Sequence, residues 1–318
     1  MTLRIRRILV AVRDPRHTSR SLLRKAATLA QASHARVELF HAIDDPLLAE
    51  TARYGRRSRS AADDLETVRT RAVQRLERLA RSAFPDPRRV QVHAEWDYPP
   101  HEAIVRRAVA TRADLVIAAT RERWPGARLL LANTDWELIR TCPCPLLLVK
   151  TPRAYGRGAV IACLDPFHAH DKPAALDRRI LDAGTQLANA IGGELHAFHA
   201  YLPIVATVPS ALGQPVPVWL PPDVEEQHGR RVRAAFDALA REARIPPARR
   251  HLRMGDIANE LTALIRRTRA RVVVMGAVSR SGLKRLFIGN TAERVLDRLP
   301  CDVLIVKPRG FRSPVPPR

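Results

Sequence analysis

The most informative part of the chain is residues 276–291, which read Gly-Ala-Val-Ser-Arg-Ser-Gly-Leu-Lys-Arg-Leu-Phe-Ile-Gly-Asn-Thr. This stretch follows an apolar run at 272–275 and precedes a sequence with helical periodicity. A strand, a loop of small residues and a helix in this order can form a cradle for phosphate. Glycine lets backbone amides approach an anion, and the N-terminus of the next helix presents unpaired N–H groups to it.

Strands and helices are expected to alternate along the whole chain. Five strands are predicted in the first half, at 8–12, 37–42, 90–95, 115–119 and 146–150, with helices at 20–33, 60–83, 99–111 and 133–141. Five more strands are predicted at 159–164, 195–200, 250–253, 272–275 and 303–307. Such alternation implies an α/β fold, with a parallel sheet covered on both faces and ligands bound at the carboxyl ends of the strands.

The chain also repeats itself, which indicates a duplicated domain. An offset of 157 residues places Asn133-Thr134 on Asn290-Thr291 and Pro143-Cys144 on Pro300-Cys301. Upstream, Phe40-His41-Ala42 matches Phe198-His199-Ala200, and Asp14 matches Asp165 just after the first strand of each copy. We therefore predict two domains at 1–150 and 159–308, a linker between them, and a basic, proline-rich tail at 309–318 that is mobile.

Residues 276–291 resemble the nucleotide loop of the universal stress protein family, in its tandem-domain, stress protein E-like class. The family pattern is Gly, two residues, Gly, nine residues, Gly, then Ser or Thr. Gly276 and Gly289 have the right separation, whereas Ser279 replaces the middle glycine and Asn290 the hydroxyl residue. The resemblance covers nearly the whole chain. It implies two Rossmann-like (adenine nucleotide alpha hydrolase-like) domains of strand order 3-2-1-4-5, packed as a pseudo-dimer through their fifth strands.

The resemblance also implies where a nucleotide would bind. In the second domain Asp165 lies where family members contact the nucleoside. The phosphate-loop positions are Gly276, Ser279, Gly289, Asn290 and Thr291, and Arg280 adds positive charge. We expect ATP, if bound, in this domain only. The alternative is that Gly276 and Gly289 only end a strand and begin a helix, with Arg280 in solvent.

The first copy is less well equipped, and we expect it to be a structural partner. Ala119, Glu122 and Ala132 replace all three glycines, and the Glu122 carboxylate would repel phosphate. Trp124 and Pro125 would fill and stiffen its loop. His41 and His199 end equivalent strands and are interpreted as hydrogen-bonded core residues rather than as bases or ligands.

The chain carries a formal net charge of +22, and 54 of its residues are Lys or Arg. These residues are scattered through every predicted helix, and aromatic residues that could stack on bases are few, which argues against a dedicated nucleic-acid module. No apolar run approaches the ~20 residues needed to span a bilayer, so no membrane partner is expected. Four cysteines without zinc spacing indicate no metal site and favour a reducing, cytoplasmic compartment.

Residues 202–222 stand out because they contain six prolines and no charged residue. Proline blocks a regular helix, so we predict an extended loop. A loop this apolar should fold over the strand ends as a lid, contact an apolar ligand or a protein partner, or pack on its own domain.

These observations together predict a cytoplasmic tandem universal stress protein that binds and regulates rather than catalyses. No Walker motif, zinc-protease motif or nucleophile elbow is present in the sequence. Two alternatives stay open. One is a slow ATPase or nucleotide-handling enzyme, because the fold family that the resemblance implies includes adenylating members. The other is a basic protein associated with RNA or DNA.

Overall fold

The computed structural model describes residues 5–44, 59–120, 133–167, 175–203, 205–209, 215–219, 221–277 and 295–318. The first half contains β1 (Arg7–Ala11), α1 (Arg20–Ser33), β2 (Arg36–Ile43), α3 (Arg59–Ala83), β3 (Val90–Trp96), α4 (Pro100–Ala110), β4 (Leu115–Ala119), α5 (Asn133–Thr141) and β5 (Leu146–Val149). The second half contains β6 (Ala159–Cys163), α6 (Ala175–Ile191), β7 (Glu194–Tyr201), α7 (Pro222–Glu242), β10 (Arg250–Met254), α8 (Ile257–Thr268), β11 (Val272–Gly276) and β12 (Asp302–Val306). Short 3-10 turns at Pro87–Arg89 and Pro247–Arg249 lead into β3 and β10.

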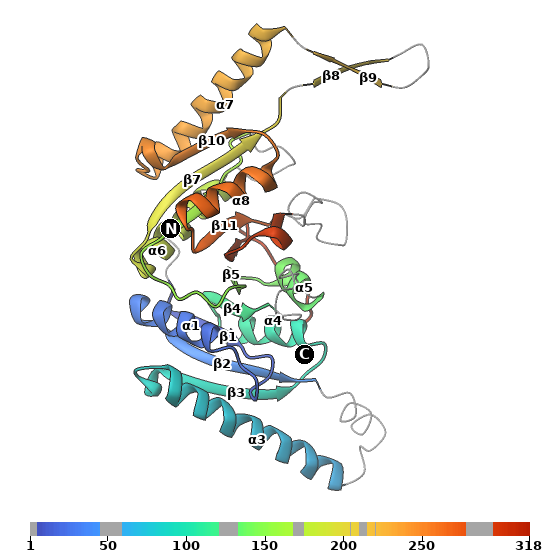
Figure 1. Cartoon of the computed structure of the whole chain (residues 1–318). Helices are drawn as coiled ribbons and strands as arrows, with labels where there is room; N and C mark the ends of the chain where they lie inside the picture. The colour runs from blue at the N-terminus through green and yellow to red at the C-terminus, as the bar shows by residue number, and fades with distance from the viewer. Residues whose placement is uncertain are drawn as a thin grey trace.

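A single ten-stranded sheet runs through the molecule, in the order β10-β7-β6-β11-β12-β5-β4-β1-β2-β3 (Figure 1). Counted within its own half, each set of five strands has the order 3-2-1-4-5 and is parallel throughout. The halves meet at their fifth strands, where β5 and β12 pair antiparallel with Leu147 opposite Leu304. The predicted α/β fold class is confirmed, and each of the ten predicted strands is present within two residues of its predicted ends.

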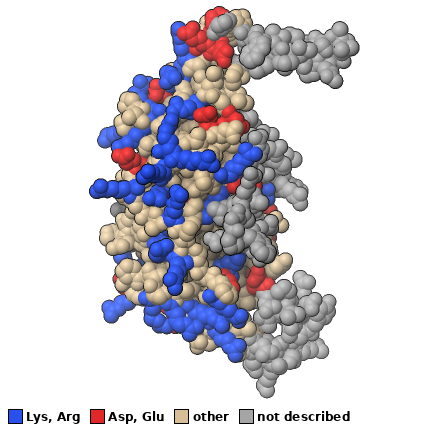
Figure 2. All heavy atoms as spheres, in the orientation of Figure 1, with Lys and Arg blue, Asp and Glu red and all other residues tan. Residues whose placement is uncertain are grey.

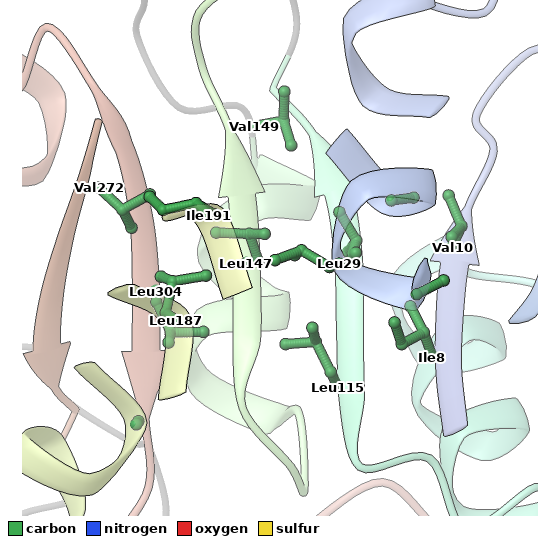
Figure 3. Close-up of a cluster of buried hydrophobic side chains, with 14 of the residues drawn as sticks. Ile8, Val10, Leu29, Leu115, Leu147, Val149, Leu187, Ile191, Val272 and Leu304 are labelled. Carbon is green, nitrogen blue, oxygen red and sulfur yellow. The ribbon is translucent and has the colours of Figure 1, made fainter. Parts of the chain in front are cut away.

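Both faces of the sheet are buried, because alternate residues of each strand point to opposite sides. Ile8 and Val10 of β1 belong to one apolar cluster, while Leu9 and Ala11 belong to the other. Helices α1, α3, α6 and α7 cover the first face, and α4, α5 and α8 cover the second. Figure 3 shows the first cluster continuing across the joint of the two halves, with Leu147 and Leu304 side by side.

The joint also contains a buried carboxylate with several hydrogen-bond donors. Asp302 is fully buried and accepts hydrogen bonds from the Lys25 amine at 2.6 Å and the Tyr155 hydroxyl at 2.9 Å. The backbone N–H groups of Lys150 and Thr151 donate to its other oxygen at 3.0 and 3.1 Å. Burying a charge is costly unless it is paired and hydrogen-bonded, and these four donors meet that requirement.

Two equivalent lysines cross the joint in opposite directions. Lys150, just after β5, donates to the carbonyl of Leu296 in the second half, and Lys307, just after β12, donates to the carbonyl of Arg140 at 3.0 Å. Burial lowers the pKa of both amines from 10.5 to about 8. Each lysine thus meets carbonyls at the end of a helix in the other half, where positive charge is favourable.

Residues 202–222 differ from the predicted loop. They contain a two-stranded antiparallel hairpin, β8 (Val205–Pro209) and β9 (Pro215–Trp219), which projects from the end of the second half (Figure 1). The prolines did exclude a helix, but they allow a hairpin because its residues need hydrogen bonds on one side only.

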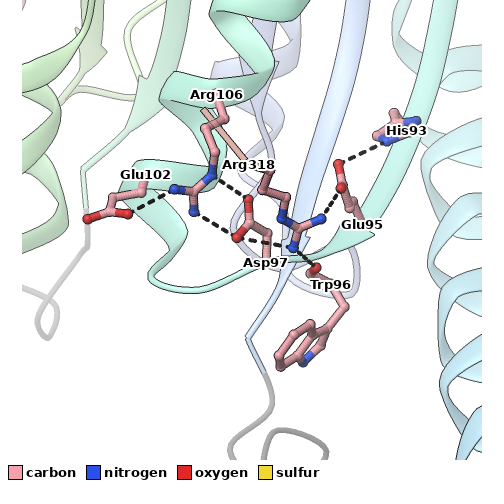
Figure 4. Close-up of polar contacts among 7 residues, drawn as sticks. All are labelled: His93, Glu95, Trp96, Asp97, Glu102, Arg106 and Arg318. Atoms are coloured by element: carbon pink, nitrogen blue, oxygen red, sulfur yellow. Dashed lines mark hydrogen bonds and ion pairs between the residues drawn. The ribbon is translucent and has the colours of Figure 1, made fainter. Parts of the chain in front are cut away.

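The segment 309–318 was predicted to be mobile, and the structure instead places it against the first half. Val315 packs on the second apolar cluster, and the Arg318 guanidinium donates to Glu95 and to the carbonyl of Trp96. Arg318 also lies 3.2 Å from Asp97 (Figure 4). The low apolar content of the tail does not reveal these contacts, which depend on Glu95 near the end of β3 and Asp97 just after it.

Candidate functional site

The carboxyl ends of β1, β2 and β4 surround a cavity of about 270 Å3 in the first half. Its apolar wall consists of five side chains from two strands and two helices: Phe40, Ala42, Ala118, Ile104 and Leu138. Small residues at the strand ends leave this space open, because Ala42 and Ala118 fill little of it. The cavity lies where parallel α/β sheets bind ligands, beside the strand-order switch at β1 and β4.

Polar groups also line this cavity. Asp135 is buried in the first turn of α5, and the half-exposed Arg13 lies 3.6 Å from its carboxylate. Asp44 and Thr134 also line the cavity. The arrangement suits a ligand with an apolar ring and a few polar edges.

Asp14 follows β1 but folds back on its own turn. Its carboxylate accepts the Arg16 N–H at 2.7 Å and lies 2.9 Å from the His17 ring nitrogen. Burial alone would raise the pKa of Asp14, but the hydrogen bonds from His17 and Arg16 hold that pKa below its ordinary value. Asp14 therefore stays ionised and is engaged locally.

The two strand-end histidines have the structural role that the sequence predicts. His41 Nδ1 lies 2.9 Å from the Val12 carbonyl, and His199 Nδ1 lies 2.9 Å from the Leu164 carbonyl. Each ring thus donates an N–H across the ends of the first two strands of its half. Burial lowers the pKa of His41, so the ring is neutral at pH 7.

In the second half, Asp165 and Gly276 end neighbouring strands at the same edge. The parallel register pairs Ala162 of β6 with Val274 of β11, so the chain leaves both strands at the same level. Asp165 is half-buried, and its N–H donates to the Asp177 carboxylate at 3.1 Å. The two residues therefore lie near the same carboxyl edge of the sheet.

Gly276 has a packing role of its own. A Cβ atom at this position would lie 2.7 Å from Leu176 Cδ2 and 3.2 Å from Ile180 Cδ1, both in α6. The glycine therefore allows α6 to approach β11, whatever the following loop binds. The remaining predicted phosphate-loop residues, Ser279, Arg280, Gly289, Asn290 and Thr291, lie outside the described part of the chain.

Sequence reasoning did not find the cavity of the first half. The glycine positions in the sequence point to the second domain. The cavity of the first domain is indicated instead by small residues at the carboxyl ends of its strands. Glu122, Trp124, Pro125 and Ala132 of the corresponding loop lie outside the described residues.

The surface charge is spread rather than concentrated. Lys and Arg side chains extend along the whole length of the face in Figure 2, with acidic residues among them. Among the described residues no group of three or more metal-ligating side chains occurs, and no described helix is long and apolar enough to cross a membrane. Within that part of the chain, neither a metal centre nor a single basic stripe defines the site.

The doubled sheet, with two sets of five parallel strands joined at their fifth strands, defines a tandem α/β protein. A model of the Universal stress protein family matches residues 4–150 and 168–307. The chain belongs to this family and carries two of its domains.

Curated relatives match at nearly full length. Universal stress protein E of Salmonella typhi is 28% identical and that of Photorhabdus laumondii 26% identical, each covering 96% of both chains. A crystal structure of a functionally unknown protein from Pseudomonas aeruginosa PAO1 is 25% identical, with a TM-score of 0.70 over 96% of this chain and 94% of that one. A universal stress protein from Archaeoglobus fulgidus shares the fold at 16% identity and a TM-score of 0.59, over 95% of this chain and 98% of its own.

Proposed function

We propose that this tandem universal stress protein is a regulatory binding protein whose second domain holds one adenine nucleotide. The observation that carries the proposal is the parallel pairing of β6 with β11, which brings the segments after both strands to one edge. The relatives named Universal stress protein E, similar over 96% of the chain, support a stress-response role.

The proposed roles follow the order of groups in a nucleotide. Asp165 contacts the nucleoside, and the loop that begins after Gly276 holds the phosphates. In that loop Gly289 would admit the anion and Arg280 would offset its charge. Asn290 and Thr291 stand at the start of the helical pattern in the sequence, and the N–H groups at the start of a helix favour an anion.

Calorimetric titration with ATP tests this proposal. We expect one site per chain, abolished by Gly289→Leu because the new side chain would occupy phosphate space. The matched control is Ala132→Leu at the equivalent position of the first domain, which should leave ATP affinity unchanged. Two equal sites, or binding that survives Gly289→Leu, would overturn the proposal.

A second candidate function rests on the described cavity of the first domain. Phe40, Ile104 and Leu138 offer an apolar wall suited to an uncharged ring, whereas Glu122 in the adjoining loop would repel phosphate. We propose that this cavity takes a nucleoside-like or other ring without phosphate. Ala118→Leu should abolish adenosine binding there and leave ATP binding intact, and an adenosine affinity unchanged by Ala118→Leu would refute it.

Two further measurements test the alternative functions of the chain, an ATPase and a nucleic-acid-binding protein. Phosphate release from ATP above the level of Gly289→Leu would favour a slow ATPase. RNA binding that falls steeply with salt would favour a nucleic-acid role.

We propose the uncharged hairpin segment 202–222 as a contact surface for an apolar ligand or a protein partner, because an isolated two-stranded hairpin is marginally stable in water. Native mass spectrometry of the freshly purified chain would reveal such a ligand.

A further inference from the structure

Two thiols lie close together where α5 leads into β5. The Sγ atoms of Cys142 and Cys144 are 3.9 Å apart, and Pro143 is the only residue between them. Cys142 is fully buried at the end of α5, where its N–H donates to the Leu138 carbonyl at 2.9 Å, and Cys144 is half-buried. Two residues of chain span at most about 7 Å, and a disulfide needs Cα atoms about 4.4–6.8 Å apart. A bridge is therefore within reach if the sulfur atoms move by about 2 Å.

A buried amine from the other domain faces this pair. Lys307 follows β12, donates to the Arg140 carbonyl at 3.0 Å and lies 4.5 Å from the centre of the Phe311 ring. The two sulfur atoms share a hydrogen bond, and this bond with Cys144, together with the Lys307 charge, lowers the pKa of Cys142. The same bond, burial and the Asp114 charge raise the pKa of Cys144. The first negative charge of the pair therefore resides on Cys142.

The corresponding place in the second domain lacks this chemistry. Cys301 is the counterpart of Cys144, but Leu299 stands where the first domain has Cys142. Burial and the neighbouring Asp302 raise the pKa of Cys301 well above its ordinary value, which keeps it in the unreactive thiol form. The pair beside Lys307 is thus a feature of the first domain.

We propose that Cys142 and Cys144 are a reversible redox-active dithiol, which a hydroperoxide oxidises to a disulfide at the joint of the two domains. A peroxide that enters beside the half-buried Cys144 meets the Cys142 thiolate, which attacks a peroxide oxygen and breaks the O–O bond, so that a sulfenic acid forms and the alkoxide leaves and takes up a proton. The Cys144 thiol then attacks the sulfenic sulfur, and its proton leaves with the hydroxyl group as water. In sum, two thiols give two electrons to one hydroperoxide and yield a disulfide, an alcohol and water.

Lys307 is the positioning residue of this proposal. Its ammonium group holds the thiolate form of Cys142 and tethers the end of α5 to the second domain through Arg140. Formation of the disulfide removes the negative charge that faces Lys307. The joint of the two domains therefore changes its electrostatics when the pair is oxidised, and a thiol reductant restores it by exchange.

The first test maps oxidation in the full-length chain. The reduced protein is treated with graded hydrogen peroxide, denatured, alkylated and analysed by peptide mass spectrometry. We expect a Cys142–Cys144 disulfide that dithiothreitol reverses, while Cys163 and Cys301 remain open to alkylation. Absence of this disulfide, or equal oxidation of all four cysteines, would overturn the proposal.

The second test separates the role of Lys307 from general loosening of the joint. Lys307→Met should slow oxidation at pH 7 by about tenfold and move the pH–rate midpoint upward, because the thiolate loses its partner. Lys150→Met is the matched control, since Lys150 crosses the same joint but its amine meets the second domain at Leu296, and its rate should stay within about twofold. Equal slowing in both variants would overturn the positioning role.

If Lys307→Met does not fold, the pH dependence of the oxidation rate in the unaltered chain tests the proposal instead. The charged groups that act on the pair are Lys307 and Asp114. A pH–rate midpoint below the ordinary thiol value of 9.0 supports the proposal, and a midpoint at or above that value refutes it.

Discussion

The two halves of the molecule share one strand order, yet their carboxyl edges differ at the same position. Strand β4 ends with Ala119, which lines the cavity of the first half, whereas β11 ends with Gly276, whose missing side chain leaves room for Leu176. In the first half this position keeps a methyl group that packs on the first apolar cluster, and in the second half the neighbouring helix takes that space. A duplicated fold can therefore keep its sheet while the two edges become specialised for different neighbours.

The joint is asymmetric as well. Asp302 begins β12 and accepts hydrogen bonds from the first half and the linker, while its counterpart just before β5 is Pro145. The paired fifth strands hide two sheet edges that would otherwise invite association. We infer that the two halves form one rigid body, and residues 1–150 expressed alone should be less stable than the whole chain or should associate.

The largest expected effect comes from Asp302→Ala. This change leaves the buried Lys25 amine without its carboxylate, and loss of one partner of a buried pair costs about 3–5 kcal/mol. Denaturant unfolding monitored by circular dichroism measures the loss. The double change Lys25→Met with Asp302→Leu should cost much less, and Glu66→Ala, in an exposed pair, should leave the free energy of unfolding almost unchanged. A loss below about 1 kcal/mol for Asp302→Ala would show that the joint does not depend on this carboxylate.

Gly276→Val sharpens the comparison of the two edges. The new side chain would overlap Leu176 and Ile180, and overpacking of this kind costs about 1–3 kcal/mol. The control change Ala118→Val, one residue earlier in β4, directs its methyl groups toward the cavity of the first half and should cost under about 1 kcal/mol. Equal losses of unfolding free energy in the two variants would remove the distinction.

The sequence predicts this architecture well because its signals are local and repeated. Apolar runs bounded by helical patterns give the ten strands, and the offset of Cys144 from Cys301 reveals the duplication. The site is less predictable because it depends on distances between elements. Nothing in the spacing of Gly276 shows that Leu176 fills the space beside it. Nothing in the sequence near Arg318 indicates that this side chain contacts Glu95 and Asp97.

The outer strands differ in their response to acid. At the same position of the second strand, the first half has Glu38 paired with Arg107, and the second half has His196 hydrogen-bonded to His251 at 2.9 Å. Burial, with the charges of His196 and Arg267, lowers the pKa of His251 from 6.5 to about 4. The unfolded chain therefore binds a proton more readily, so stability from this pair is complete above pH 6.5 and is lost as pH falls toward 4.

We expect the loss to be on the order of 1 kcal/mol, because solvent near the two rings screens part of the effect. Hydrogen exchange at pH 7 and near pH 4.5 measures it, with faster exchange in β10 than in β3 at the lower pH. Replacing both His196 and His251 with Leu should remove this difference. The same acid sensitivity in the double variant would assign it to other groups.

The smallest effect concerns the tail, which crosses from the second half to the first and has no counterpart after β5. Arg106 already holds Asp97 at 2.7 Å, and Arg318 adds a half-exposed contact to the same carboxylate (Figure 4). Arg318→Ala should therefore lower the free energy of unfolding by less than about 1 kcal/mol. At about 1 M salt the difference from the unaltered chain should vanish, because exposed charges are screened over about 3 Å there. Arg312→Ala, in the same tail, is the control for a general loss of charge. A larger loss of unfolding free energy that persists in high salt would mean that Arg318 holds the tail by packing as well as by charge. The stability of the two halves would then depend on the tail more than the exposure of Arg318 indicates.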